Sequence, residues 1–116
     1  MDGIVIPPDA ERVPRGTGTF RVLAELDELE VIDMRFGPEF EGVDPHMHDD
    51  HVDSFYILEG EAEFTLGDEV VRAAPGTFVA APPGLVHGFR SVGDVDLRIL
   101  NVHAPNTGFA RRFRER

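Results

Sequence analysis

The sequence predicts an all-β fold, an antiparallel β-barrel followed by a short C-terminal helix. Strand-like stretches recur about every ten residues, a spacing typical of barrels and sandwiches. Tight turns separate these stretches at Gly67-Asp68, Pro75-Gly76 and Gly93-Asp94. Helical spacing of apolar residues is found only near the C-terminus, in residues 106–116. A chain of 116 residues is long enough for a single domain with one core.

The chain divides into three predicted parts. Residues 1–19 form an extended N-terminal segment, because the stretch 6–19 is rich in Pro and Gly. Residues 20–105 form the barrel, and residues 106–116 form a short basic helical tail. Within the barrel, alternating or apolar runs predict strands at 20–26, 30–36, 54–58, 61–66, 69–73, 77–81, 85–92 and 95–104.

The strand at 30–36 shows the pattern of a half-buried strand. Apolar and polar residues alternate along it, which predicts one buried face and one face in water. The wet face includes Asp33, and the buried face consists of Ile32, Met34 and Phe36. In the tail, Phe109 and Phe113 are four residues apart and are expected to pack on the barrel, while the arginines around them face water.

Composition excludes several classes of function. The net charge of −11 argues against a nucleic-acid or anionic-membrane partner. The chain has no Cys, so any metal must be held by His and carboxylate groups. No apolar run approaches the roughly 18 residues of a membrane span. The N-terminal stretch has no long apolar segment typical of a secretion signal, and we expect a cytoplasmic protein.

Residues 45–53, with the sequence PHMHDDHVD, contain three histidines and three aspartates in nine positions. Such a stretch is either a polar surface loop or half of a metal site, and a metal site requires a second half. His46 and His48 are two residues apart, so in a strand both imidazoles point to the same side. A further candidate, His87, follows a Pro-x-Gly turn at residues 82–84 that can bring it across the barrel.

Together these segments resemble the two short motifs of the cupin superfamily. Its first motif is His-x-His, followed by three or four residues, Glu, six residues and Gly. This sequence matches it at His46, His48, Asp53 and Gly60, with Asp in the position of the Glu. The second motif is matched by Gly76, Pro82, Gly84 and His87, and Ser91 replaces its final Asn. The upstream Gly of the family would fall at Phe40, although Gly42 is nearby.

The resemblance implies a small single-domain cupin, a double-stranded antiparallel barrel of the jelly-roll type. It also implies one divalent transition metal inside the barrel mouth, held by His46, His48, Asp53 and His87. A His and carboxylate set of this kind suits Fe, Mn, Ni, Cu or Zn. Because Asp is shorter than Glu, three arrangements stay open. Asp53 binds the metal directly, it hydrogen-bonds a ligand histidine instead, or His51 takes part.

The residues that share the inward direction of the ligands predict the pocket. If the ligands point inward, we expect an apolar, aromatic substrate pocket with a polar metal end, lined by Met34, Phe36, Phe55, Ile57, Phe89 and Asn101. His103 shares a strand face with Asn101 and is either a proton carrier in catalysis or a hydrogen-bonded strand histidine. Arg35, Arg90 and Arg98 fall on the opposite faces of their strands, so no cation is expected inside and a phosphosugar fits poorly.

Three functions remain under consideration. The first is a metal-dependent dioxygenase similar to quercetinase-like cupins, acting on an apolar or aromatic molecule that chelates the metal through oxygens. The second is a metal-dependent isomerase, lyase or decarboxylase. The third is a non-catalytic cupin that binds a small molecule. The family resemblance also implies a homodimer, in which the extended stretch 4–15 pairs with the partner barrel.

Overall fold

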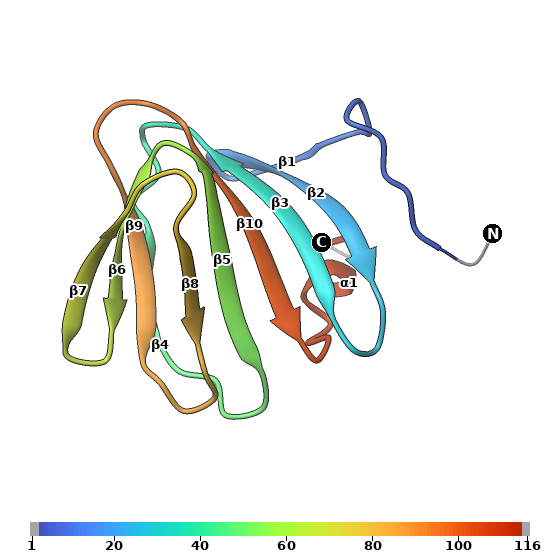
Figure 1. The fold of residues 1–116 in the computed structure, drawn as a ribbon. Helices are drawn as coiled ribbons and strands as arrows, with labels where there is room; N and C mark the ends of the chain where they lie inside the picture. The colour runs from blue at the N-terminus through green and yellow to red at the C-terminus, as the bar shows by residue number, and fades with distance from the viewer. Residues whose placement is uncertain (1–2, 115–116) are drawn as a thin grey trace.

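The computed structural model describes residues 3–114, which fold into two antiparallel sheets that face each other (Figure 1). One sheet has six strands in the order β1 (Val13–Arg15), β2 (Gly18–Glu25), β3 (Glu30–Phe36), β10 (Leu97–Ala104), β5 (Val52–Glu59) and β8 (Phe78–Ala81). The other has four, in the order β4 (Val43–His46), β9 (His87–Val92), β6 (Glu61–Leu66) and β7 (Glu69–Ala73). The predicted antiparallel all-β architecture is confirmed.

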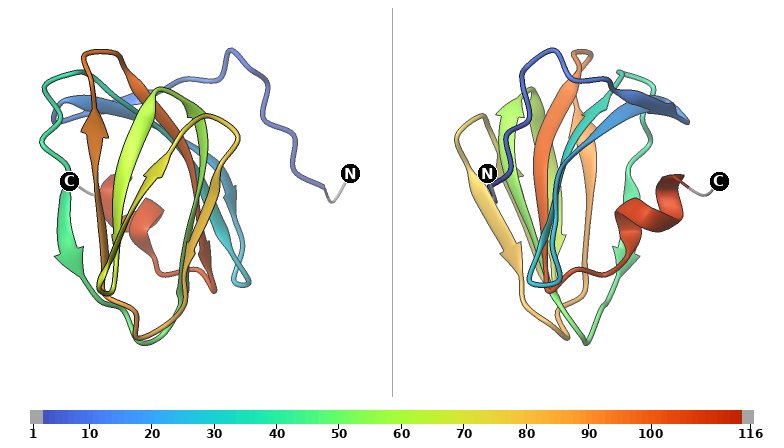
Figure 2. Two further views of the ribbon diagram at one scale, coloured as in Figure 1. Left: turned by 60° about the vertical axis from the view of Figure 1, so that its left-hand side comes forward. Right: turned by 90° about the vertical axis from the view of Figure 1, so that its right-hand side faces the viewer.

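The C-terminal part of the chain contains a short helix, α1 (Phe109–Arg114), which was also predicted. It lies beside the barrel rather than along its axis (Figure 2). The predicted N-terminal segment and basic tail include residues 1–2 and 115–116, which lie outside the described residues. Within residues 3–114, no helix has the length and apolar character needed to span a membrane.

Two strands were not predicted from the sequence. β1 forms a hairpin with β2 inside the stretch expected to be merely extended. β4 contains Pro45 and pairs with β9 at only two positions, Val43 with Phe89 and His46 with His87, with an irregularity between them. A strand this short and interrupted carries no alternating pattern, so the sequence gives no signal for it.

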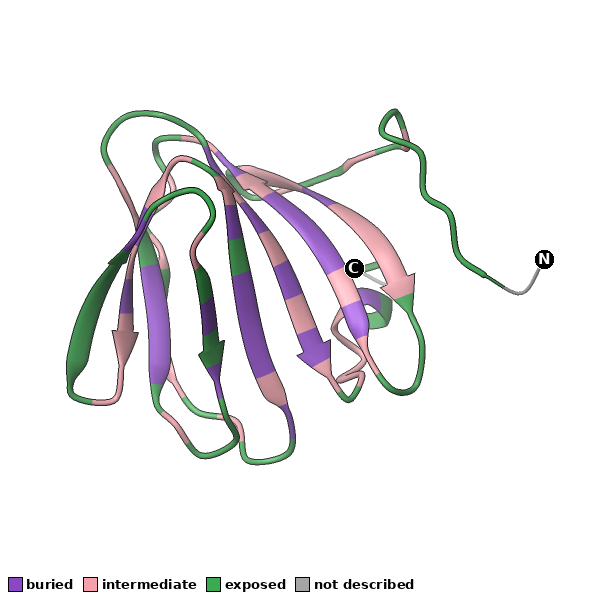
Figure 3. Ribbon diagram, viewed as in Figure 1, coloured by how far each residue is buried: buried purple, intermediate pink, exposed green. Residues whose placement is uncertain are grey.

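The core lies between the two sheets. Side chains alternate along the inner strands, and β10 shows this as stripes of buried and half-buried residues (Figure 3). The fully buried side chains include Ile57, Phe64, Leu97 and Ile99, each with no exposed surface. Phe64 packs against Phe55 and Phe89 with ring centroids 5.0 and 5.3 Å apart, so aromatic contacts join the sheets.

Asp33 contradicts the prediction for β3. It was expected to face water, but its side chain is only 1% exposed. Arg12, Arg21 and Arg98 surround it with ion pairs of 3.0, 2.9 and 2.8 Å. Burial acts to raise the pKa of Asp33, but hydrogen bonds from Arg98 and Arg12 outweigh it and hold the pKa well below its usual value. On the outer face of this sheet, the side chain of Asp33 is therefore covered by three arginines.

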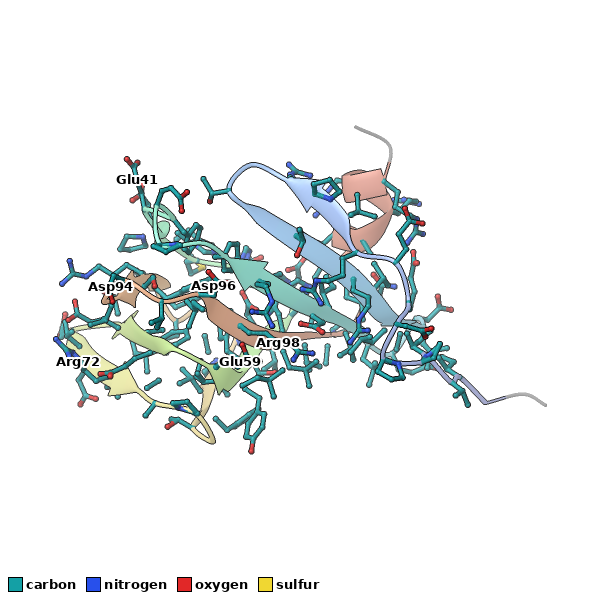
Figure 4. All side chains as sticks on the ribbon, turned by 90° about the horizontal axis from the view of Figure 1, so that it is seen from above. Glu41, Glu59, Arg72, Asp94, Asp96 and Arg98 are labelled. Atoms are coloured by element: carbon teal, nitrogen blue, oxygen red, sulfur yellow. The ribbon has the colours of Figure 1, made fainter. Side chains whose placement is uncertain are left out.

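Arg98 extends this charge cluster to the neighbouring strand. Its Nη1 lies 3.6 Å from Glu59 on β5, and the two side chains are seen near each other in the view from above (Figure 4). Arg21 also donates to the backbone carbonyls of Pro7 and Pro8, at 3.3 and 2.7 Å. The N-terminal segment is thus held to the outer face of the six-stranded sheet at these two residues. Its first described residues then lead away from the barrel (Figures 1 and 2).

Two glycines allow β4 to lie close to β9. A Cβ atom at Gly88 would be 2.6 Å from the carbonyl oxygen of Val43, and one at Gly42 would be 2.6 Å from that of Phe89. Gly42 also has a φ of 110°, which L side chains rarely adopt. Gly42 therefore has the positive φ just before β4, whereas Phe40, at the family's glycine position, does not. The close approach sets the position of the first histidine of the site.

Candidate metal centre

Four predicted ligand residues are brought together at one end of the barrel. His46 is the last residue of β4, Asp53 is the second residue of β5, and His87 is the first residue of β9. His48 lies in the loop after β4, so the expectation that it shares a strand with His46 was wrong. Nevertheless, one ligand atom from each of the four residues lies within 4.8 Å of all the others.

The hydrogen bonds of two rings define where their lone pairs point. Nδ1 of His46 lies 2.8 Å from the carbonyl oxygen of Asp44, and Nδ1 of His87 lies 2.9 Å from that of Leu85. A carbonyl oxygen can only accept, so each Nδ1 carries the hydrogen and donates it. In a neutral ring, Nε2 then presents a lone pair. Backbone carbonyls commonly orient metal-binding histidines in this way.

The lone pair of His87 faces an anion. Its Nε2 lies 3.0 Å from Oδ2 of Asp53, and Nε2 of His48 lies 3.9 Å from the same oxygen. Two such groups approach this closely when a proton or a metal cation lies between or beside them. Ligand atoms at about 2.1 Å from one ion lie at most about 4.2 Å apart. A small adjustment of the rings is enough to reach that spacing, so the donor set fits a divalent metal.

Asp53 divides its two oxygens between different partners. Oδ1 accepts a hydrogen bond of 2.8 Å from Asn101 and faces Nε2 of His103 at 3.3 Å, whereas Oδ2 faces the histidine cluster. Burial acts to raise the pKa of Asp53, but hydrogen bonds from His103 and Asn101 outweigh burial and lower the pKa from its usual value to about 2. The carboxylate is therefore anionic at neutral pH, and its Oδ2 lies 3.0 Å from Nε2 of His87 and 3.9 Å from Nε2 of His48.

His103 connects Asp53 to a second buried carboxylate. Its Nδ1 lies 2.8 Å from Oε1 of Glu30, which has no exposed surface. Burial acts to lower the pKa of His103, but hydrogen bonds to Asp53 and Glu30 outweigh it and raise the pKa. Burial acts to raise the pKa of Glu30, but its bonds from Thr107 and His103 lower it overall. The raised pKa favours the protonated ring of His103, which lies between the carboxylates of Glu30 and Asp53.

Glu30 was not singled out by the sequence, although it orders the tail as well. It accepts hydrogen bonds from the backbone nitrogens of Thr107 and Ala110, at 3.1 and 3.3 Å, and from the hydroxyl of Thr107. These residues lead into α1 and form its first turn. No local pattern marks such a residue, because its partners lie more than seventy positions away.

His51 does not belong to the four-residue cluster. It forms a second buried group with Asp53 and His103, and its Nδ1 lies 2.7 Å from the carboxylate of Asp50. Its ring centroid is 4.3 Å from that of His48. Burial, together with repulsion from the rings of His51 and His46, lowers the pKa of His48. His48 is therefore neutral at pH 7, as a metal ligand must be.

A cavity of about 550 Å³ opens next to the histidines, within the size range of small-molecule sites. Five of the six predicted pocket residues line it: Met34, Phe36, Phe55, Phe89 and Asn101. Ile57 does not, because it is fully enclosed in the core. Asn101 has its amide nitrogen turned to Asp53 and to the carbonyl of Ser54, both at 2.8 Å. Its main role in this structure is to orient Asp53.

Several lining residues were not predicted. The aromatic wall also includes Phe20, Phe40 and Phe109, and Phe36 stacks on Phe40 with centroids 3.9 Å apart. Two arginines, Arg15 and Arg112, line the cavity as well, so the expectation that it holds no cation was wrong. These arginines come from β1 and α1, which lie outside residues 20–105, the predicted range of the barrel.

Comparison with known proteins agrees with this geometry. A family model for the cupin domain matches residues 32–103. The chain is 34% identical over 61 residues to an uncharacterized protein of Streptomyces coelicolor, a match covering 53% of this chain and 54% of that protein. It is 26% identical over 85 residues to quercetin 2,3-dioxygenase of Bacillus subtilis, covering 71% of this chain and 25% of the enzyme. The matches thus span about half and a quarter of these relatives.

Solved structures show the same fold. The structure of KdgF from Halomonas sp. superimposes with a TM-score of 0.81, covering 91% of this chain and 96% of the other, at 20% sequence identity. At that identity the likeness concerns the fold alone. Three findings lead to one conclusion. They are the two sheets, the buried His and Asp groups consistent with a metal site, and the family match over most of the barrel. This chain belongs to the cupin family.

Proposed function

We propose that this cupin binds one divalent transition metal through His46, His48, Asp53 and His87. The observation that carries the proposal is the meeting of imidazole lone pairs and one carboxylate oxygen beside an aromatic cavity. We further propose that the protein is a dioxygenase of the quercetinase-like type, acting on a small apolar or aromatic molecule that chelates through oxygens. The distant match to quercetin 2,3-dioxygenase supports this choice of reaction.

The chain's own residues perform definite tasks in this proposal. When bound, a transition metal supplies Lewis acidity for enolate or catecholate oxygens and redox chemistry toward dioxygen. The backbone carbonyls of Asp44 and Leu85 keep two rings in the ligand orientation. Asn101 holds Asp53 so that Oδ2 faces the cluster. The phenylalanines of the wall bind an apolar ring and exclude water from the reacting atoms.

Metal analysis and oxygen uptake test the proposal. We expect untagged protein to contain close to one transition-metal ion per chain, and the metal-loaded protein to consume dioxygen with at least one member of a panel of flavonols, catechols and diketones. His48→Ala is expected to lower the metal content by at least tenfold and abolish uptake, because it removes one ligand. A wild-type chain that binds none of Fe, Mn, Ni, Cu or Zn would contradict the proposal.

His51→Ala is the matched control, because His51 is three residues from His48 but outside the four-residue cluster. This variant is expected to keep its metal. Loss of metal in His51→Ala together with retention in His48→Ala would reverse the ligand assignment. The pair therefore also decides whether His51 takes part in the site.

One observation favours a second function, that of an isomerase, lyase or decarboxylase. His103 lines the cavity beside Asp53, and its raised pKa favours the protonated form that could donate a proton to a substrate there. Turnover of a carbonyl or carboxylate substrate under strict anaerobiosis would select this function over the dioxygenase. Tight retention of a small molecule without turnover in either atmosphere would instead identify a non-catalytic binding protein.

A further inference from the structure

Two arginines, Arg15 and Arg112, line the cavity outside the metal site, and Arg112 is the one considered for ligand binding. Arg112, on α1, lines the cavity, and its Nη1 donates to the backbone carbonyl of Thr107 at 2.8 Å. Within residues 3–114, no carboxylate forms an ion pair with it. One bond to a carbonyl leaves most of its five N–H donors available. Arg112 is exposed, so these donors are open to a ligand that enters the cavity.

Most other arginines of the described chain have carboxylate partners. Ion pairs of 3.6 Å or less are formed by Arg12, Arg21, Arg35, Arg72, Arg90, Arg98 and Arg114. Arg111, next to Arg112 on the same helix, lines a different cavity together with Glu25 and Asp27. Arg112 thus differs from its neighbour in facing the aromatic cavity.

The wall near Arg112 is aromatic. Phe109, one helical turn before it, stacks on Phe20 with centroids 6.1 Å apart and meets the ring of His103 edge-on at 5.7 Å. These residues line the same cavity as the histidines of the metal site. The cavity therefore combines metal-binding histidines, an apolar wall and the guanidinium of Arg112.

From this combination, and resting on the function proposed above, we infer that the ligand is an organic carboxylate. Its apolar or aromatic body contacts the phenylalanine wall, its chelating oxygens face the histidine cluster, and its carboxylate accepts hydrogen bonds from Arg112. A guanidinium matches a carboxylate with two parallel hydrogen bonds. The cavity is also lined by Asp50 and Asp53, and their charges favour a single negative charge over a phosphate dianion.

A matched pair of probes tests this inference by binding alone. The probes are 3-(3,4-dihydroxyphenyl)propionate and its methyl ester, which share the chelating catechol and differ in one charge. Calorimetric titration uses the full chain loaded with zinc, which has no redox chemistry. We expect the acid to bind about fivefold more tightly than the ester at low salt, with a smaller ratio at high salt.

Arg112→Gln is expected to bring the acid-to-ester ratio close to one while leaving the affinity for the ester unchanged. Arg111→Gln is the control, because it removes the same charge from the same helix at the other cavity. It is expected to keep the ratio of the wild-type chain. Circular dichroism of both variants checks that the fold is retained.

The possible failures are distinguishable. Zinc titration without any probe comes first, and a chain that binds no zinc overturns both the proposed function and this inference. A chain that binds zinc but takes up both probes equally overturns the inference alone. So does an Arg112→Gln variant that keeps the full preference for the acid, or an Arg111→Gln variant that loses it equally.

Discussion

At the scale of single residues, Asp53 shows how one carboxylate serves two groups. One oxygen accepts from Asn101 and faces His103, and the other faces the histidine cluster. The sequence predicted its place in the motif but left its role open, because one residue type at one spacing does not reveal side-chain partners. Asn101 and His103 lie 48 and 50 positions further along the chain, and only the pairing of β5 with β10 brings them to Asp53.

Asp33 supports a prediction about acid stability. Its folded-state pKa lies well below that of an unfolded Asp, about 3.9. Below about pH 4 the unfolded chain therefore binds more protons than the folded one, and the free energy of unfolding falls as the pH falls. Asp33→Asn is expected to lower the free energy of unfolding at pH 7 by about 3 kcal/mol, because three arginines lose their anion, and to weaken the loss of stability in acid.

Urea unfolding between pH 7 and pH 3, followed by far-ultraviolet circular dichroism, measures both effects. Asp96→Asn is the control, because Asp96 pairs with Arg35 but has 46% of its side chain exposed. Its effect is expected to stay below about 1 kcal/mol. An Asp33→Asn variant as stable as the Asp96→Asn variant at pH 7 would show that the buried charge cluster contributes little.

At the scale of elements, the strands with clear patterns were predicted and those defined by partners were not. β3, β6 and β10 have alternating or apolar runs, and each lies close to its predicted range. β4 is held by its pairing with β9 rather than by its own pattern. The alternation in β3 also failed to reveal that Asp33 is buried, because the arginines around it come from other parts of the chain. Local periodicity reports which residues share a face, not what covers that face.

The contact between β4 and β9 leads to a prediction for the metal site. In Gly88→Ala, the new Cβ would lie 2.6 Å from the carbonyl oxygen of Val43 and 2.8 Å from the nitrogen of Pro45. β4 must then move away from β9, and His46 at its end moves with it. We expect zinc affinity to fall at least tenfold, measured by competition with a chromogenic chelator.

The matched control is Ser91→Ala, on the same strand. The hydroxyl of Ser91 is buried but has no hydrogen-bond partner in the described chain, so its removal costs little. Its zinc affinity is expected to equal that of the wild-type chain. Equal zinc affinity in Gly88→Ala would mean that the position of β4 does not determine the site.

At the scale of the whole molecule, exposed apolar residues of the N-terminal segment favour pairing with another chain. Ile4, Val5 and Ile6 are exposed on a segment that leads away from the barrel (Figure 2). β8 is an edge strand of the six-stranded sheet, and Phe78 on it is 62% exposed. An exposed apolar strand edge is prone to pair with another chain. The homodimer expected from the sequence stays a prediction with this structural support.

Light scattering after size-exclusion chromatography tests the assembly. We expect the full chain to be a dimer at micromolar concentration, and a variant with Ile4, Val5 and Ile6 changed to Ser to shift toward the monomer, because it buries less apolar surface on pairing. Thermal unfolding of the variant checks that its barrel remains folded. A monomeric wild-type chain at these concentrations would contradict the prediction.

The bond network of Glu30 has a consequence for how the protein can change. The same carboxylate is hydrogen-bonded to His103 and to the residues at the start of α1, the helix that places Arg112 at the cavity. Detaching the helix would leave an anion inside the barrel with one partner instead of three, next to the ring that neighbours Asp53. Substitutions at the tail and at the histidine end are therefore expected to have non-additive effects on the free energy of unfolding.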